Sequence, residues 1–294
     1  MMTKQFRRFI APARRRAQLW RLILGIVVMA AVYLAGVTIV LAVIWLAVGT
    51  NDWSGWAVEM VTAATAVGTL LLLASFIGMA LAPMVAARLV HRRTLRSLFG
   101  PAVTVVRDFC VAAGIVATIS AVLLLVWSLW FDAVPNLAPE RWLSFLPLAV
   151  AGLLVQTVAE ELVFRSYLTQ QLAARFKSPL VWMILPSLAF GLVHYSPQSA
   201  GANAWLVVGA AGIFGLIATD LTRITGSIGA AWGFHFANNF AAILILATDG
   251  TIPGLALYLT PYGADDTTYL PMLIIGDLAL MVLAWLILRR ALRR

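Results

Sequence analysis

The stretch "LILGIVVMAAVYLAGVTIVLAVIWLAV", residues 22–48, contains no charged side chain. A helix of about 20 apolar residues crosses a bilayer core of ~30 Å, so this stretch predicts a membrane-spanning helix. It is too long for the apolar core of a signal peptide and no small-residue cleavage site ends it, so we expect it to remain in the mature protein. Comparable runs predict about eight transmembrane helices: 22–48, 57–83, 109–131, 143–168, 179–195, 204–222, 226–247 and 269–288.

The composition also indicates a membrane protein. Of the 294 residues, 62% are hydrophobic and 11% are charged, with a mean hydropathy of +0.94. A water-soluble domain could not bury this much apolar surface, so we expect an all-α membrane protein with the lipid bilayer as its main partner. The single cysteine, Cys110, cannot form an internal disulfide, and its apolar neighbours indicate a small packing residue.

Basic residues alternate with acidic ones from one connecting segment to the next. Lysine and arginine gather in 1–21, 88–96, 175–177, 223 and 289–294, whereas the opposite loops carry aspartate and glutamate and one basic residue, Arg141. The positive-inside rule then places both termini in the cytoplasm. The net charge of +9 therefore reflects topology, and no nucleic-acid partner is expected. His91 lies in a basic loop and is expected to face solvent or headgroups.

The segment "VAEELVFRSYL", residues 158–168, places two glutamates and an arginine in an apolar run. Charges in a bilayer are costly and often functional. Glu161 and Arg165 are four apart in the favourable order for an ion pair on one helix face. Glu160 points about 100° away around the helix and needs another partner or a function.

Two histidines lie in other apolar runs, His194 and His235, and Asn239 follows His235 by one helical turn. A carboxylate in a partly dry cavity can take a proton from water, and imidazole and amide donors can stabilise an oxyanion. Glu160, His194 and His235 could instead hold zinc. No HExxH pair is present, so the metal-free reading, with no cofactor, is favoured over zinc.

Three ordered motifs, "EELVFR" at 160–165, "FGLVH" at 190–194 and "HFANN" at 235–239, resemble the signature of the CaaX prenyl endopeptidase and bacteriocin-processing family of intramembrane glutamic proteases. The resemblance covers residues 143–247. It implies that Glu160 activates water, that His194 positions it, and that His235 and Asn239 form the oxyanion site. Glu161 and Arg165 would support the helix. Ser166 stands where many members have glycine.

The sequence thus predicts an intramembrane endopeptidase in a bacterial plasma membrane. Its domains would be a basic N-terminus (1–21), accessory helices (22–131), the protease core (143–247) and a last helix with a basic tail (269–294). The substrate would be a peptide or protein at the membrane surface, either prenylated or a bacteriocin-type precursor.

Two alternatives stay open, and one geometric point fits poorly. Glu160, the histidines and Asp277 could form the relay of a proton-coupled transporter, and Glu59 is a further unexplained acid. The chain could also be a silent immunity or scaffold member of the family. His194 lies near the outer end of its run, so its helix would have to tilt, start deeper or break near Pro186 to bring it to Glu160.

Overall fold

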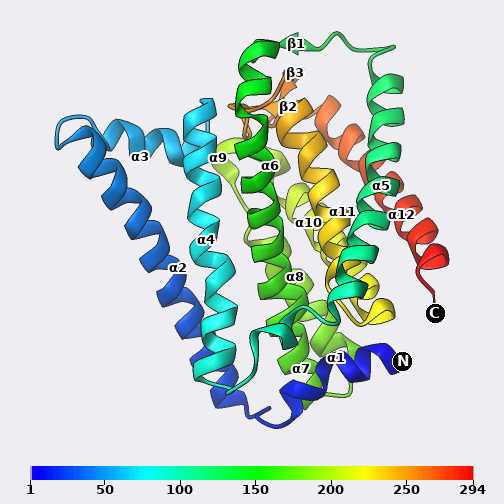
Figure 1. Ribbon diagram of the computed structural model, residues 1–294. Coiled ribbons are helices and arrows are strands. Elements are labelled where there is room, and N and C mark those ends of the chain that lie inside the picture. The colour runs from blue at the N-terminus through cyan, green and yellow to red at the C-terminus, as the bar shows by residue number, and fades with distance from the viewer. Residues whose placement is uncertain (1, 294) are drawn as a thin grey trace.

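The computed structural model describes residues 2–293, and it is a bundle of helices with a small sheet at one end (Figure 1). The helices are α1 (Lys4–Arg14), α2 (Leu19–Val48), α3 (Trp53–Thr62), α4 (Ala66–Leu89), α5 (Ala102–Trp127), α6 (Pro139–Glu161), α7 (Thr169–Arg175), α8 (Leu185–Leu192), α9 (Pro197–Ala200), α10 (Ala204–Thr225), α11 (Gly229–Phe240) and α12 (Tyr269–Ala291). The π-helical turns are Leu162–Leu168, Leu180–Ile184 and Ala241–Ile245, and the 3-10 turns are Leu95–Leu98 and Gly201–Asn203.

Six helical segments in residues 2–293 are long and apolar enough to cross a membrane, so the protein is an all-α integral membrane protein. Their bounds are Leu19–Val48, Ala66–Leu89, Leu95–Trp127, Pro139–Arg175, Pro197–Thr225 and Tyr269–Ala291. The other two expected runs, 179–195 and 226–247, are also helical but shorter. Both supply side chains to the interior of the bundle, among them Phe190 and Phe234.

The expected second span, 57–83, is wrong at its start. The chain breaks at Ala63, whose φ of 49° is left-handed, and α4 begins only at Ala66. Thr65 caps α4 by accepting from the backbone N–H of Gly68, and its hydroxyl donates to the Glu59 carboxylate at 2.9 Å. Glu59 therefore has a local structural partner at this break, which a count of apolar residues does not reveal.

Small residues bring α11 against α5. A Cβ at Gly233 would collide with the backbone carbonyl of Phe109, and one at Gly229 would collide with that of Val105. The buried core beside this contact includes Phe214, Phe234 and other side chains of α10 and α11. The close approach holds α11, and with it His235, firmly in the bundle.

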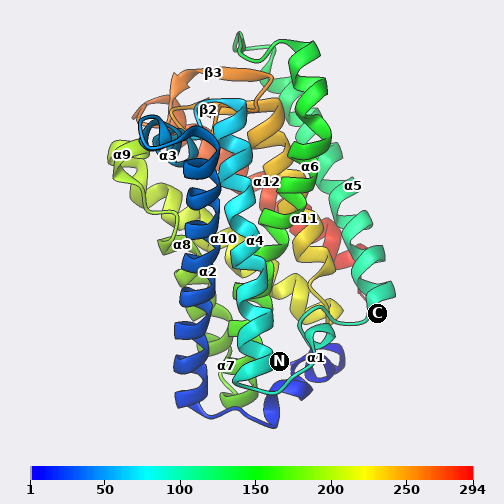
Figure 2. The ribbon, with the colours of Figure 1, turned by 60° about the vertical axis from the view of Figure 1, so that its left-hand side comes forward.

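The segment after residue 245 contributes to a small sheet. Strands β2 (Leu246–Asp249) and β3 (Tyr258–Gly263) pair in parallel, and β1 (Val134–Pro135) pairs antiparallel with β3, giving the order β1-β3-β2. This sheet lies at the end of the bundle opposite α1 (Figures 1 and 2).

Two side chains lie in environments other than those expected. His91 is buried, with 2% of its surface exposed, because its ring is enclosed by Tyr167 and the backbone of Arg16. Cys110 is exposed on α5 and is therefore no interior packing residue. In both cases the neighbours come from the tertiary fold, which the local sequence does not specify.

Candidate active site

Glu160 and Glu161 are the last residues of α6, directly before the π-helical turn Leu162–Leu168. Both are buried, with 8% and 0% of their surface exposed. The helix continues through this turn into α7, so the carboxylates lie inside a 37-residue helical segment, Pro139–Arg175. Single π-helical turns inside helices occur frequently at functional sites.

The ion pair that the spacing predicts is present. Arg165 Nε lies 3.3 Å from Glu161 Oε2, and neither side chain is more than 1% exposed. The guanidinium carbon also lies 4.0 Å from the ring centroid of Phe190 and 5.2 Å from that of Phe214. Aromatic faces attract cations, so the two rings and Glu161 together compensate a fully buried charge.

His235 on α11 lies between the two glutamates. Its Nδ1 is 2.9 Å from Glu161 Oε1 and its Nε2 is 3.5 Å from Glu160 Oε2. An ionised carboxylate only accepts hydrogen bonds, so Nδ1–H of His235 donates this hydrogen bond to Glu161. Glu161 thus orients the imidazole and directs Nε2 toward Glu160, and the unpaired Glu160 of the sequence has its partner.

Asn239, one turn beyond His235 on α11, makes no hydrogen bond to the imidazole among the described interactions. Its Nδ2 donates instead to Oε1 of Gln156 at 3.0 Å. Gln156 lies one turn before Glu160 on α6, so one face of α6 places both the amide and the carboxylate. The sequence analysis missed Gln156, although a lone glutamine in the run "AGLLVQTVAEE" was a usable signal.

His194 lies just beyond the end of α8. The π-helical turn Leu180–Ile184 precedes Pro186, so the helix changes its geometry near this proline without ending there. The Nδ1 of His194 donates to the carbonyl of Phe190 at 2.8 Å. Since Nδ1 carries the proton, Nε2 of a neutral ring is left as an acceptor.

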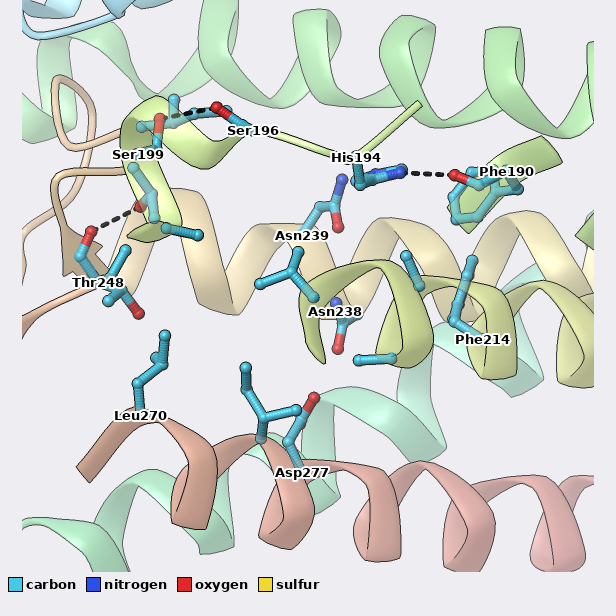
Figure 3. A pocket seen from close by; sticks show the side chains of 18 of the residues that line it. Phe190, His194, Ser196, Ser199, Phe214, Asn238, Asn239, Thr248, Leu270 and Asp277 are labelled. Carbon is cyan, nitrogen blue, oxygen red and sulfur yellow. Dashed lines mark hydrogen bonds between the residues drawn. The ribbon is translucent and has the colours of Figure 1, made fainter. Parts of the chain in front are cut away.

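A cavity of about 550 Å³ brings His194, His235 and Asn239 together. Asn238 and Asp277 belong to the same lining. Figure 3 shows Asp277 on α12, across the cavity from His194 and Asn239. Glu160 is not part of this lining; it lies behind His235, with which it is in contact. The wall is mainly apolar, with helix α10 contributing Phe214 and other side chains.

The suggested zinc ligands do not converge. Among residues 2–293, no three His, Cys, Asp or Glu side chains are close enough together to hold a metal ion. Nδ1 of His235 is held by Glu161 and Nδ1 of His194 by a backbone carbonyl, contacts that metal-binding histidines also make, so each ring would bind through Nε2. The spacing of the three side chains, and not these hydrogen bonds, is what departs from a zinc site in this arrangement.

The fold and the site define a polytopic membrane protein with a buried carboxylate, imidazole and amide beside an intramembrane cavity. Residues 141–241 match the family model described as type II CAAX prenyl endopeptidase Rce1-like. The matched segment contains all six motif residues, from Glu160 to Asn239. The resemblance indicated by the three motifs is thus confirmed over this segment.

A curated protein is also similar to this chain. It is the uncharacterized protein YyaK of Bacillus subtilis (strain 168), 32% identical over 120 residues. The match covers 39% of this chain and 38% of that protein, so it extends over well under half of either. No solved structure gives a significant match.

Proposed function

We propose that this protein is a CAAX-type intramembrane endopeptidase that hydrolyses a peptide bond with water activated by Glu160. The contact between Glu160 and Nε2 of His235, beside the cavity lined by His194 and Asn239, carries the proposal. The match of residues 141–241 to the endopeptidase model supports the same class of reaction.

The reaction uses these groups in order. The oxygen of a water molecule adds to the carbonyl carbon of the substrate while Glu160 takes the water's proton. The negative charge that develops on the carbonyl oxygen is stabilised by N–H donors from His235 and Asn239. Glu160 then gives its proton to the amine nitrogen as the carbon–nitrogen bond breaks. His194, with Nε2 free to accept, positions the water.

The substrate is a peptide or protein segment at the membrane, and prenylated proteins and bacteriocin-type precursors are the two candidates. The mostly apolar cavity wall suits a lipid-modified or apolar segment. The distribution of basic residues supports an orientation with both termini in the cytoplasm, and an Ala- and Arg-rich composition with short loops supports a bacterial plasma membrane. The metal-free form of the mechanism is preferred because the sequence has no HExxH pair.

The test is cleavage of a quenched library of prenylated CaaX-type peptides by the purified protein. Glu160→Gln removes the proton acceptor with little change of shape, so we expect hydrolysis to fall by at least about a thousandfold with an unchanged melting temperature. Glu140→Gln, an exposed site on the same helix, is the matched control and should retain full activity. Equal activity of Glu160→Gln and wild type would refute the mechanism.

The same assay with a metal chelator distinguishes the glutamic mechanism from a zinc-dependent one. Activity that persists with the chelator supports the glutamic mechanism. Activity that is lost with the chelator and restored by zinc would replace it with a metal-dependent one.

A further inference from the structure

A second cavity, of about 590 Å³, lies at the end of the bundle opposite the sheet. It is formed by α1, by the connection from α1 to α2, and by the segment that follows α4. Figure 2 shows α1 at this end of the bundle, and it packs against α7. Five arginines and a histidine line it: Arg8, Arg15, Arg16, His91, Arg92 and Arg93.

No carboxylate balances these arginines. Residues 2–18 and 89–101, the two segments that supply the lining of this cavity, contain no aspartate or glutamate. Within residues 2–293, none of the five arginines belongs to a salt bridge. Like charges held together without a counter-charge destabilise the fold, so the cavity favours an anionic occupant.

Arg93 supplies the buried part of the site. It is 5% exposed, and burial lowers its pKa to about 10. Its Nε donates to Ser97 Oγ at 3.3 Å and its Nη2 donates to Gln170 Oε1, while Nη1 is buried with no hydrogen-bond partner. A buried guanidinium with a free donor is costly unless a ligand accepts from it.

His91 holds the cavity in shape without adding charge. Its Nδ1 is 3.0 Å from the carbonyl of Arg16 and its Nε2 is 2.8 Å from the hydroxyl of Tyr167. Burial lowers its pKa to about 4, so the ring is neutral at pH 7. The next residue, Arg92, adopts a left-handed φ of 51°. The backbone at Arg16 and Arg92 is thus held in place before a ligand arrives, which lowers the cost of binding.

Exposed apolar side chains stand at the adjoining ends of the membrane helices. Trp20 is 57% exposed, Ile23 is 63% exposed and Leu89 is 67% exposed. Arg21, which lies over the Trp20 ring, donates to the carbonyl of Val90 at 2.7 Å and ties the start of α2 to the end of α4. An occupant with both an anionic group and acyl chains would match the cavity and this surface.

We propose that this cavity binds the phosphate of an anionic phospholipid headgroup, with Arg93 Nη1 as its buried donor and Arg8 and Arg92 as partners at its rim. Phosphate accepts several hydrogen bonds from guanidinium groups. The site is separate from the carboxylates of α6, although Tyr167 and Gln170, which contact its buried members, follow them on the same helical segment.

The test measures melting of the full-length protein in detergent, by tryptophan fluorescence, during titration with short-chain phosphatidylglycerol, phosphatidylcholine or inorganic phosphate. The variant Arg8→Gln with Arg92→Gln changes two exposed rim residues, which protects the fold. The control, Arg88→Gln with Arg96→Gln, removes the same charge from exposed positions outside the cavity lining. We expect phosphatidylglycerol to stabilise the wild type, and the rim variant to bind it roughly tenfold or more weakly.

The control variant should bind phosphatidylglycerol within about threefold of wild type, since only general surface attraction is reduced. Equal weakening in the two variants would overturn the proposal in favour of nonspecific charge. No stabilisation of the wild type by phosphatidylglycerol would also overturn it, as would equal stabilisation by phosphatidylcholine. Saturation by inorganic phosphate alone would overturn the assignment to a lipid.

Discussion

At the scale of single residues, the site depends on charges that compensate one another inside the bundle. Glu161 contacts both Arg165 and His235, at 3.3 Å and 2.9 Å. One carboxylate therefore neutralises a buried cation and orients the imidazole. This placement is consistent with the prediction from the sequence that Glu161 and Arg165 support the helix that carries Glu160. The stability of variants tests that prediction.

Arg165→Met should lower the stability of the protein strongly. Removing one partner of a buried pair leaves the other charge uncompensated and typically costs about 3–5 kcal/mol. The double variant Glu161→Gln with Arg165→Met should lose less than the sum of the two single variants. The free energy of unfolding in mixed micelles measures the loss in the single variants and in the double variant. Arg141→Met, an exposed site on α6, should stay within about 0.5 kcal/mol of wild type; additive losses in the cycle would argue against the pair.

A substitution at Asp277 distinguishes the protease hypothesis from the transporter hypothesis. Its carboxylate lines the cavity but lies across it from His194 and Asn239, and neither of its oxygens contacts the Glu160–His235 pair among the described interactions. Asp277→Asn should therefore keep kcat within about threefold, because no transition-state contact is lost. The assay is the same peptide cleavage. A loss as large as that of Glu160→Gln would revive a proton relay.

At the scale of elements, the contact of α11 with α5 decides where His235 lies. Gly233→Leu should disrupt it, since the new side chain would have to occupy the space of the Phe109 backbone. Overpacking typically costs about 1–3 kcal/mol and more where backbone is displaced. Activity and melting temperature should fall together. Gly114→Leu on α5, where nothing lies within 4 Å, is the control and should be tolerated; a stable, active Gly233→Leu would contradict this packing.

The membrane class and most helices could be predicted from the sequence because apolar run length reports bilayer thickness directly. The Glu161–Arg165 pair follows from local spacing, so it too was predictable. The break at Ala63, the π-helical turns and the small sheet depend on tertiary partners. They could therefore not be predicted from the sequence. For the same reason the sequence did not indicate that Gln156 binds Asn239 or that His91 is buried.

At the scale of the whole molecule, the charges divide between the two ends of the bundle. The arginine cavity and α1 lie at one end, and the acidic connections with the sheet lie at the other. Anionic lipids of the cytoplasmic leaflet would favour the basic end on their side. The same orientation would place the proposed lipid site and both chain termini toward the cytoplasm.

Cysteine labelling tests this orientation on a Cys110→Ser background. Asn51→Cys lies in the connection between α2 and α3, and Arg96→Cys lies in the turn Leu95–Leu98 at the opposite end. A membrane-impermeant maleimide added to intact cells should label Asn51→Cys at least about tenfold more than Arg96→Cys, because the positive-inside rule keeps the basic connection in the cytoplasm. Permeabilised cells should label both equally, since each position is exposed. The reverse pattern in intact cells would mean that the protein has the opposite membrane orientation, with the arginine cavity at the outer leaflet.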